Sequence, residues 1–348
     1  MRATRWHGVG DVRLVDEPAP EPGPGAVVLD VRACGICGSD VHAYAEGAWI
    51  TAGARMGHEY AGTVASVGEG ITTLAPGDRV AVIPMGPCGS CTRCREGSTN
   101  LCAGPRSSAG GGLAEQVLVP DAEDGKLYRL PDPVTFEEGA FLEPLSVAVR
   151  AVRQSGATAG GGPVVVAGLG SIGQCVLRVL AAHGVTDVLG IDVSPPRLER
   201  AAETGAAVID ARRTDPVAHV RERWGTSDSP YQPGSGNVAA FVECSGAGPM
   251  LAAATALTRA GGTVVLAGLA GHVPPVDVDT VVQKELRLRG SFAYTADDGA
   301  EAFRLLTGGA VDVTSLVSHR VPLSRVGEAF AAQHAVDGSV KVVVVPDR

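Results

Sequence analysis

The sequence predicts an α/β protein of two domains, one rich in short β-strands and one built on a doubly wound parallel sheet. Three observations lead to this fold class. The chain has 348 residues, which suggests two domains rather than one. As far as about Phe136, short apolar segments are separated by Gly and Pro turns. From Pro163 onward, apolar strands alternate with helices, as in a parallel sheet covered on both faces.

The first part of the chain is predicted to be β-rich. Strands are expected at 26–33, 60–67 and 79–83, and a Pro-Gly-Asp turn at 76–78 precedes the last of them. No long helical period comes before Phe136. Over 136–154, small and apolar residues recur at helical spacing, and Pro144 must kink or restart this helix.

Glycines over 155–162 mark a boundary, after which strands and helices alternate. The expected strands are 163–168, 187–192, 206–209, 239–243, 263–268 and 285–290. The first two are followed by helices at 172–183 and 195–204, and a polar loop is expected at 226–237. The tail, 317–345, returns to short strands around one helix at 323–333, and we expect it to fold back onto the first domain.

The composition indicates a folded, acidic protein. Hydrophobic residues make up 45% and charged residues 19% of the chain, so a packed core is expected. The net charge of −9 argues against nucleic acid and anionic membranes as partners. No apolar run approaches the ~20 residues of a membrane span, and residues 1–15 contain no apolar signal-peptide core. We therefore expect a soluble cytoplasmic protein.

A glycine-rich segment at 168–173 has the pattern of a dinucleotide-binding turn. Its spacing, GxGxxG, is a weak signal alone, but it follows a buried strand and opens a helix, where free N–H groups can bind a pyrophosphate. Asp192 ends the next strand, and its charge favours NAD over NADP because it repels a 2′-phosphate. The alternative is a structural turn with an unrelated Asp. The predicted cofactor-binding residues are Gly168, Gly170, Ser171, Ile172, Gly173, Asp192 and Arg197.

Four of the eight cysteines lie close together, with the spacing of a metal site. They are Cys88, Cys91, Cys94 and Cys102. Four thiolates this close can converge on one tetrahedral Zn²⁺, and four protein ligands leave no position for substrate. The sequence therefore predicts a structural zinc site. The alternative, free thiols on a loop, is poor because exposed cysteines are reactive.

A second, dispersed set of polar residues fits a catalytic zinc. Such a site needs a few protein ligands and one open position, which Cys37, His58 and a carboxylate would supply. Cys34 is expected in the core, and Asp40 is expected to orient the imidazole of His58. From the residues alone, this site and a set of unrelated polar side chains are equal alternatives.

In their order along the chain, these motifs resemble the zinc-containing medium-chain dehydrogenases/reductases. Gly57-His58-Glu59-Tyr60-Ala61-Gly62, with Gly68 and Ile71, is similar to the zinc signature of that family. The resemblance covers essentially the whole chain. It implies a GroES-like catalytic domain of residues 1–150 and 292–348, and an inserted Rossmann NAD-binding domain of residues 151–291. It also implies an active site in the cleft between the two domains.

The resemblance also implies two zinc ions per chain and a particular branch of the family. Cys37 and His58 match the ligands of the catalytic zinc, and Glu143 stands where the ordinary alcohol dehydrogenases have a Cys. A carboxylate there is similar to the sorbitol, butanediol and threonine dehydrogenase branch. Glu59 is an alternate ligand and a candidate catalytic residue. Which glutamate contacts the zinc in the resting enzyme is left open.

The chemistry implied is oxidation of a secondary alcohol to a ketone. Zinc lowers the pKa of the alcohol, and the carbon that bears the hydroxyl group gives a hydride to NAD⁺. By the family motif, Ser39 would take the hydroxyl proton and His42 would pass it through the cofactor ribose to water; the alternative for His42 is an ordinary surface histidine. We also expect a homodimer or homotetramer.

Two other functions compete with this interpretation, and the substrate is open within a class. A zinc-free quinone or enoyl reductase of the same fold is opposed by the cysteines, and a non-catalytic NAD-binding protein is opposed by the intact ligand and relay positions. Sorbitol dehydrogenases tend to have an Arg where this chain has Ala293. This favours a vicinal diol or amino alcohol, while polyols and cyclitols remain within the class.

Overall fold

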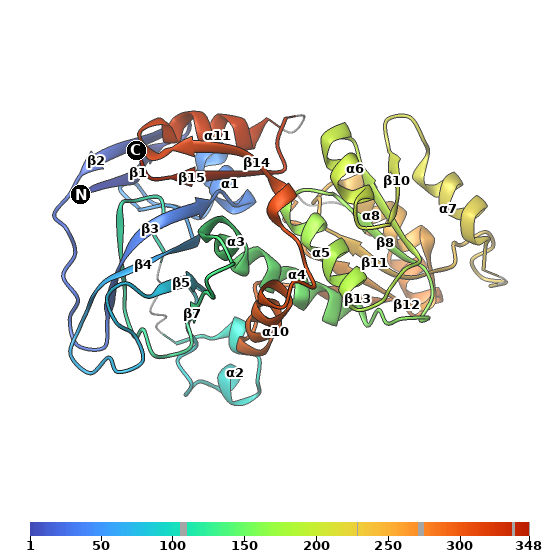
Figure 1. The fold of residues 1–348 in the computed structure, drawn as a ribbon. Coiled ribbons are helices and arrows are strands. Elements are labelled where there is room, and N and C mark those ends of the chain that lie inside the picture. The colour runs from blue at the N-terminus through green and yellow to red at the C-terminus, as the bar shows by residue number, and fades with distance from the viewer. Residues whose placement is uncertain (105–109, 228, 271–274, 336–337, 348) are drawn as a thin grey trace. The chain divides into compact units, whose positions relative to one another are not determined.

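The computed structural model describes residues 1–104, 110–227, 229–270, 275–335 and 338–347 and divides the chain into two compact units. Unit 1 comprises Met1–Ser146 and Tyr294–Arg348, and unit 2 comprises Val147–Ala293. Helix α4, Leu142–Ser155, contains the point where the chain passes from one unit to the other. Each unit has its own sheet (Figure 1).

Unit 1 is built on a mostly antiparallel sheet with the strand order β14-β15-β3-β4-β5-β7, and β6 also pairs with β3. Strand β15 pairs antiparallel with β3, with Val343 opposite Gly35, so the C-terminal tail extends the N-terminal sheet. β1 and β2 form a separate antiparallel pair. The strands of this unit are β1 Arg2–Gly8, β2 Asp11–Asp16, β3 Val27–Gly35, β4 Glu59–Val67, β5 Arg79–Val82, β6 Gln116–Val119, β7 Leu127–Arg129, β14 Val317–Pro322 and β15 Lys341–Val345.

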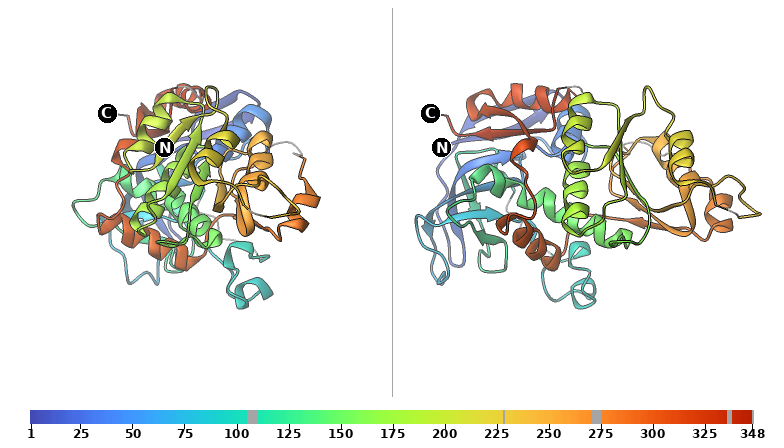
Figure 2. Two further views of the ribbon diagram at one scale, coloured as in Figure 1. Left: turned by 90° about the vertical axis from the view of Figure 1, so that its right-hand side faces the viewer. Right: turned by 45° about the vertical axis from the view of Figure 1, so that its right-hand side comes forward.

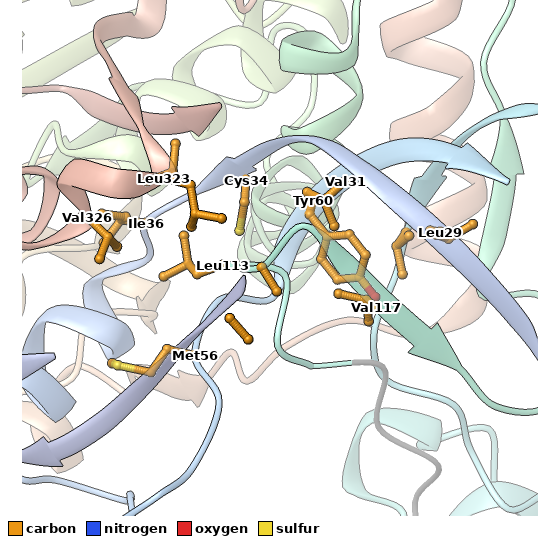
Figure 3. Close-up of a cluster of buried hydrophobic side chains, with 14 of the residues drawn as sticks. Leu29, Val31, Cys34, Ile36, Met56, Tyr60, Leu113, Val117, Leu323 and Val326 are labelled. Atoms are coloured by element: carbon orange, nitrogen blue, oxygen red, sulfur yellow. The ribbon is translucent and has the colours of Figure 1, made fainter. Parts of the chain in front are cut away.

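The core of unit 1 joins the N-terminal sheet to the tail. Leu29, Val31 and Cys34 of β3 and Tyr60 of β4 pack with Leu113, and Leu323 and Val326 of the tail belong to the same cluster (Figure 3). Cys34 is 1% exposed, which confirms its predicted place in the core. The tail therefore contributes apolar side chains as well as a strand to this unit.

Two helices in the first part of the chain were not predicted. They are α1, Gly38–Glu46, and the short α2, Thr92–Arg95. Helix α1 begins where the Asp40 carboxylate accepts the N–H of Cys37 at 3.0 Å, and it ends at Gly47, which is left-handed (φ 70°). The search for a long helical period before Phe136 missed α1, because local capping rather than a long apolar period defines this helix.

The helix expected over 136–154 is two helices. α3 spans Phe136–Ala140, and α4 starts at Leu142 after a break at Phe141. Pro144 is the third residue of α4, where the missing N–H breaks no intrahelical hydrogen bond. The predicted restart is therefore confirmed, two residues before the proline itself. The other helices of unit 1 are α10 Ala296–Thr307 and α11 Val326–His334, with 3₁₀ turns η1 Thr99–Leu101, η2 Thr314–Leu316 and η3 Leu323–Arg325.

Unit 2 is a parallel sheet of strand order β10-β9-β8-β11-β12-β13. The order runs outward in both directions from β8, which is the predicted doubly wound arrangement. Val165 and Ala167 of β8 pack in a cluster with residues of α7 and α8, whereas Val164 and Val166 point to the opposite face and are equally buried. Both faces of the sheet are therefore covered, as the views in Figure 2 show.

The strands and helices of unit 2 lie close to their predicted positions. They are β8 Val164–Ala167, α5 Ser171–Ala182, β9 Val188–Asp192, α6 Pro195–Ala202, β10 Ala207–Asp210, α7 Pro216–Trp224, β11 Val238–Glu243, α8 Gly248–Leu257, β12 Thr258–Leu266, α9 Val278–Gln283 and β13 Arg287–Gly290. β12 starts five residues earlier than expected. Residue 228 lies outside the described residues. The described part of the loop at 226–237 contains no helix or strand, and an isolated β-bridge joins Thr226 to Gly236. None of the helices in the described segments combines the length and apolar character that a bilayer span requires.

Candidate metal and dinucleotide sites

Three side chains that could hold a metal ion meet in unit 1. One ligand atom each from Cys37, His58 and Glu59 lies within 4.8 Å of the others. Cys37 precedes α1, and His58 and Glu59 stand at the start of β4. In the β3–β4 pairing Glu59 is opposite Gly35, and a Cβ at Gly35 would lie 2.3 Å from Oε2 of Glu59. A side chain at position 35 would therefore displace this carboxylate oxygen.

The carboxylate of Asp40 contacts two members of this trio, Cys37 and His58. Its carboxylate is buried and accepts the N–H groups of Cys37 at 3.0 Å and Gly57 at 3.3 Å, and Oδ2 lies 3.6 Å from Nδ1 of His58. Burial alone would raise the pKa of Asp40, but the charge of His58 and the donated hydrogen bonds outweigh it and lower that pKa. Asp40 therefore stays ionised next to the imidazole, as a residue that orients a ligand should.

The two oxygens of the Glu59 carboxylate have different surroundings. Oε2 accepts a hydrogen bond from Nζ of Lys341 at 2.5 Å, and both side chains are almost fully buried. Oε1 is also buried and has no hydrogen-bond partner within the described residues. A buried carboxylate oxygen without a partner is costly. Beside a thiol and an imidazole, it fits a zinc ligand.

Lys341 is a residue of this site that sequence reasoning missed. It lies on β15, 282 residues from Glu59 in the chain, and also donates to the carbonyl oxygen of Ile36 at 3.1 Å. Its ammonium is 5.9 Å from the centre of the Phe141 ring. No local motif surrounds it, and its role depends on the pairing of β15 with β3.

Glu143 lies next to the trio but is not a member of it. Its carboxyl is buried at the start of α4, and burial, together with the negative charge of Glu59, raises its pKa to about 7 against the opposing effect of His58. The hydroxyl of Tyr294 is buried without a hydrogen-bond partner in the described structure. Burial and then the charge of Glu143 raise the pKa of Tyr294 well above its ordinary value. Glu143 and Tyr294 are thus two further buried polar groups whose ionisation depends on this set of side chains.

The residues expected to move a proton lie on α1. Ser39 and His42 are both half-buried. Nδ1 of His42 is 3.0 Å from Oε1 of Glu46, one turn further along the helix, and its ring meets that of Trp49 edge-on at 5.9 Å. His42 is thus on the side of α1 that reaches solvent.

The four clustered cysteines converge as predicted. Their sulfurs all lie within 4.8 Å of one another, and three of the separations are 3.9 Å for Cys88–Cys94, 3.5 Å for Cys91–Cys94 and 3.9 Å for Cys91–Cys102. Zinc–sulfur bonds of about 2.3 Å in a tetrahedron place the sulfurs about 3.8 Å apart. All four are free thiols rather than disulfides, so the geometry fits one zinc ion.

In unit 2 a different local environment explains the presence of each glycine in the 168–173 turn. Gly168 has a positive φ of 83°, and a Cβ there would lie 2.6 Å from the backbone nitrogen of Ser245. A Cβ at Gly173 would lie 1.9 Å from the carbonyl oxygen of Gly168. At Gly170 the nearest atom to an added Cβ is Nη1 of Arg197 at 3.9 Å, so this side of the loop is open. Gly170 also caps α5 without a side chain, and Ser171 and Ile172 form its first turn. The turn fits a bound pyrophosphate.

Asp192 lies at the carboxyl end of β9, beside this turn. Its Oδ2 accepts the N–H of Leu169 at 2.6 Å, and its Oδ1 accepts those of Val193 and Ser194 at 2.7 and 2.8 Å. Each carboxylate oxygen has further lone pairs for ribose hydroxyls. The sequence did not foresee that Asp192 also holds the glycine-rich turn.

Comparisons with known proteins agree with this geometry. Residues 23–132 match the family "Alcohol dehydrogenase GroES-like domain" and residues 171–308 match "Zinc-binding dehydrogenase". The chain is 37% identical to sorbitol dehydrogenase of Homo sapiens, with 93% of this chain and 90% of that protein covered. It is 33% identical to (R,R)-butanediol dehydrogenase of Bacillus subtilis (strain 168), with both chains fully covered. A solved structure from Sinorhizobium meliloti 1021, described as a zinc-binding dehydrogenase bound to NADP, has a TM-score of 0.87 and 32% identity, and 99% of each chain is covered.

Proposed function

Since the chain belongs to the zinc-containing medium-chain dehydrogenases, in the sorbitol and butanediol dehydrogenase branch, we propose that it oxidises a secondary alcohol with a second polar group beside the reacting hydroxyl. The product is the ketone, and NAD⁺ accepts the hydride. The family, the fold class and the enzyme class predicted from the sequence are confirmed by these similarities. The main support for this substrate class is that a carboxylate, in addition to the thiol of Cys37 and the imidazole of His58, belongs to the set of possible metal ligands.

In this proposal Cys37, His58 and Glu59 hold the catalytic zinc. The support is their mutual distance and the buried Oε1 of Glu59, which has no hydrogen-bond partner in the described structure. Bound zinc would act as a Lewis acid on the substrate hydroxyl. Lys341 holds the second oxygen of Glu59 and so directs Oε1 to the metal position. Glu143 would be a further carboxylate ligand for the bound metal, directly or through one water, and Glu59 the alternate to it.

Carboxylates suit a substrate that offers two oxygens, or an oxygen and a nitrogen, to the metal. They are harder and more readily exchanged ligands than thiolates. A vicinal diol, polyol, cyclitol or amino alcohol can then bind through two atoms. The methyl group of Ala293, where sorbitol dehydrogenases tend to have an Arg, favours the diol or amino alcohol within this class.

The remaining site residues have supporting roles. Ser39 accepts the hydroxyl proton, and His42 passes it towards solvent, for which its half-exposed position on α1 is suited. The glycine-rich turn binds the pyrophosphate, and Asp192 favours NAD⁺ by repelling a 2′-phosphate. The four-Cys cluster binds a structural zinc. Because this site needs reduced thiols, we place the protein in the cytoplasm.

The proposed quaternary state is a homodimer or homotetramer. Val278 and Val282 of α9 are 63% and 67% exposed, and exposed apolar groups of this kind favour an interface. Light scattering after gel filtration measures the mass, and a monomer at micromolar concentration would contradict this part of the proposal.

A screen of NADH formation across vicinal diols, polyols, cyclitols, threonine and ethanol tests the substrate class. We expect the highest kcat/KM for a diol or amino alcohol, and no turnover by Cys37→Ser. A preference for ethanol over every chelating substrate would refute the substrate class. Turnover of a quinone or enone without zinc would refute the reaction itself.

A further inference from the structure

A buried amide connects the glycine-rich turn of unit 2 to the helix that follows Asp192. Gln174 lies in the first turns of α5 and its side chain is 0% exposed. Its Nε2 donates to the carbonyl oxygens of Leu169, at 3.1 Å, and Arg197, at 2.7 Å. Its Oε1 accepts a hydrogen bond from Nη1 of Arg178 at 2.9 Å. Both amide hydrogens and the amide oxygen are therefore used.

These hydrogen bonds fix Leu169 from both sides. The N–H of Leu169 donates to Asp192, and its carbonyl oxygen accepts from Gln174. Leu169 stands between Gly168 and Gly170, so the position of the open face at Gly170 depends on both contacts. A buried network in which every group is satisfied is rigid and holds a single geometry.

The second contact of Nε2 reaches α6. By binding the carbonyl oxygen of Arg197, Gln174 fixes the start of that helix against the turn. The guanidinium of Arg197 lies 3.9 Å from the point where a Cβ of Gly170 would be. Arg178 completes the network, because it holds Oε1 of Gln174 and lies 3.6 Å from Glu203 beyond the end of α6. One side chain thus sets the spacing between the open face of the turn, Asp192 and Arg197.

We infer that Gln174 is a positioning residue for the adenosine half of the dinucleotide, acting through the Leu169 carbonyl and the start of α6. The inference rests on the proposed dinucleotide site. Gln174 itself touches no cofactor in this arrangement. Its loss should weaken binding of the adenosine diphosphate part and leave the hydride-transfer step, at the nicotinamide end, nearly unchanged.

The test compares Gln174→Leu, which has nearly the same volume, with the wild-type holoenzyme. We expect Kd for ADP-ribose, measured by calorimetry, and KM for NAD⁺ to rise by about tenfold each, with kcat within about twofold; a tenfold change in Kd corresponds to about 1.4 kcal/mol. Ser155→Ala is the matched control. It also removes a buried hydrogen bond of unit 2, from Oγ to the carbonyl oxygen of Val152 at 2.6 Å, without contact to the turn.

Different results would overturn the positioning role of Gln174 and the proposed dinucleotide site itself. An unchanged Kd for ADP-ribose in Gln174→Leu, or an equal rise in Ser155→Ala, overturns the positioning role. Wild-type protein that binds neither ADP-ribose nor NAD⁺ overturns the dinucleotide site itself. If Gln174→Leu does not fold, Arg178→Met replaces it; this variant removes the partner of Oε1 together with the contact to Glu203 and leaves both hydrogen bonds of Nε2 in place. A severalfold rise in Kd for ADP-ribose with unchanged kcat then supports the role, and wild-type affinity refutes it.

Discussion

The buried pair of Glu59 and Lys341 predicts a stability effect that depends on zinc. Replacing Lys341 by Met keeps most of the side-chain volume and leaves the Glu59 carboxylate buried without its cation. The two side chains are 1% and 2% exposed, so solvent screens the lost interaction very little. Breaking a buried ion pair by removing one partner costs about 3–5 kcal/mol. We expect Lys341→Met to lose stability in this range when zinc has been removed.

Zinc should reduce that loss. A cation bound at Oε1 of Glu59 compensates part of the charge that Lys341 no longer balances, so zinc stabilises the variant more than the wild type. Urea unfolding with zinc and with chelator measures both differences. The double variant Lys341→Met/Glu59→Gln removes the unpaired charge and should recover part of the loss without recovering activity.

Lys126→Met is the control for burying a lysine as such. Lys126 is also 1% exposed, but it donates to the carbonyl oxygens of Pro120 and Asp121, and its nearest carboxylate, on Asp121, is 58% exposed. Its replacement should cost a similar amount with and without zinc. A cost of less than about 1 kcal/mol for Lys341→Met, a loss of stability that does not depend on zinc, or a double variant less stable than the single one would contradict the proposed role of the Glu59–Lys341 pair.

Three further predictions follow from the proposed sites. Metal analysis should find two zinc ions per chain, and a wild type with one zinc would show that one site is misassigned. Cys91→Ser should lower the stability of the protein, because a structural zinc site contributes folding free energy. Cys37→Ser should keep the fold and lose turnover. Asp192→Asn removes the charge and keeps one of the two oxygen acceptors, so it should narrow the ratio of kcat/KM for NAD⁺ over NADP⁺ by about tenfold. A wild type that uses both coenzymes equally would contradict the proposed role of the Asp192 charge. Glu143→Ala should lower kcat and weaken zinc retention during dialysis against chelator, and wild-type values for both would exclude Glu143 from the metal site.

The sequence predicted best those features that depend on neighbours along the chain. Strand β8 of unit 2 is apolar on both faces, and both alternating sets of its side chains are buried, so an unbroken apolar run was sufficient to identify the strand. The four clustered cysteines lie within fifteen residues, and a loop of that length can bring its sulfurs together whatever surrounds it. The glycines at 168, 170 and 173 were placed by the same short-range logic.

Helix α1 shows where this logic fails. Gly38–Glu46 has few apolar residues, and two of its side chains, Asp40 and Ala43, are buried. The helix depends on the Asp40 carboxylate at its first turn and on the left-handed Gly47 at its end. A search for apolar periodicity does not detect a helix of this kind, although Asp three residues after Cys37 was a usable capping signal.

The sequence named Glu143 as the carboxylate ligand and Glu59 as the alternate, whereas the tertiary structure groups Glu59 with Cys37 and His58. Both glutamates have suitable chemistry, and the sequence left open which of them contacts the zinc in the resting enzyme. The pairing of β15 with β3, and of β3 with β4, brings Lys341 to Glu59 across 282 residues, and Oε1 is left without a hydrogen-bond partner in the described structure. Residue types and spacing determined which groups can bind zinc and the dinucleotide. The long-range strand pairing decided which of their atoms are left without another partner, because hydrogen bonds across a sheet join residues with no proximity in the chain.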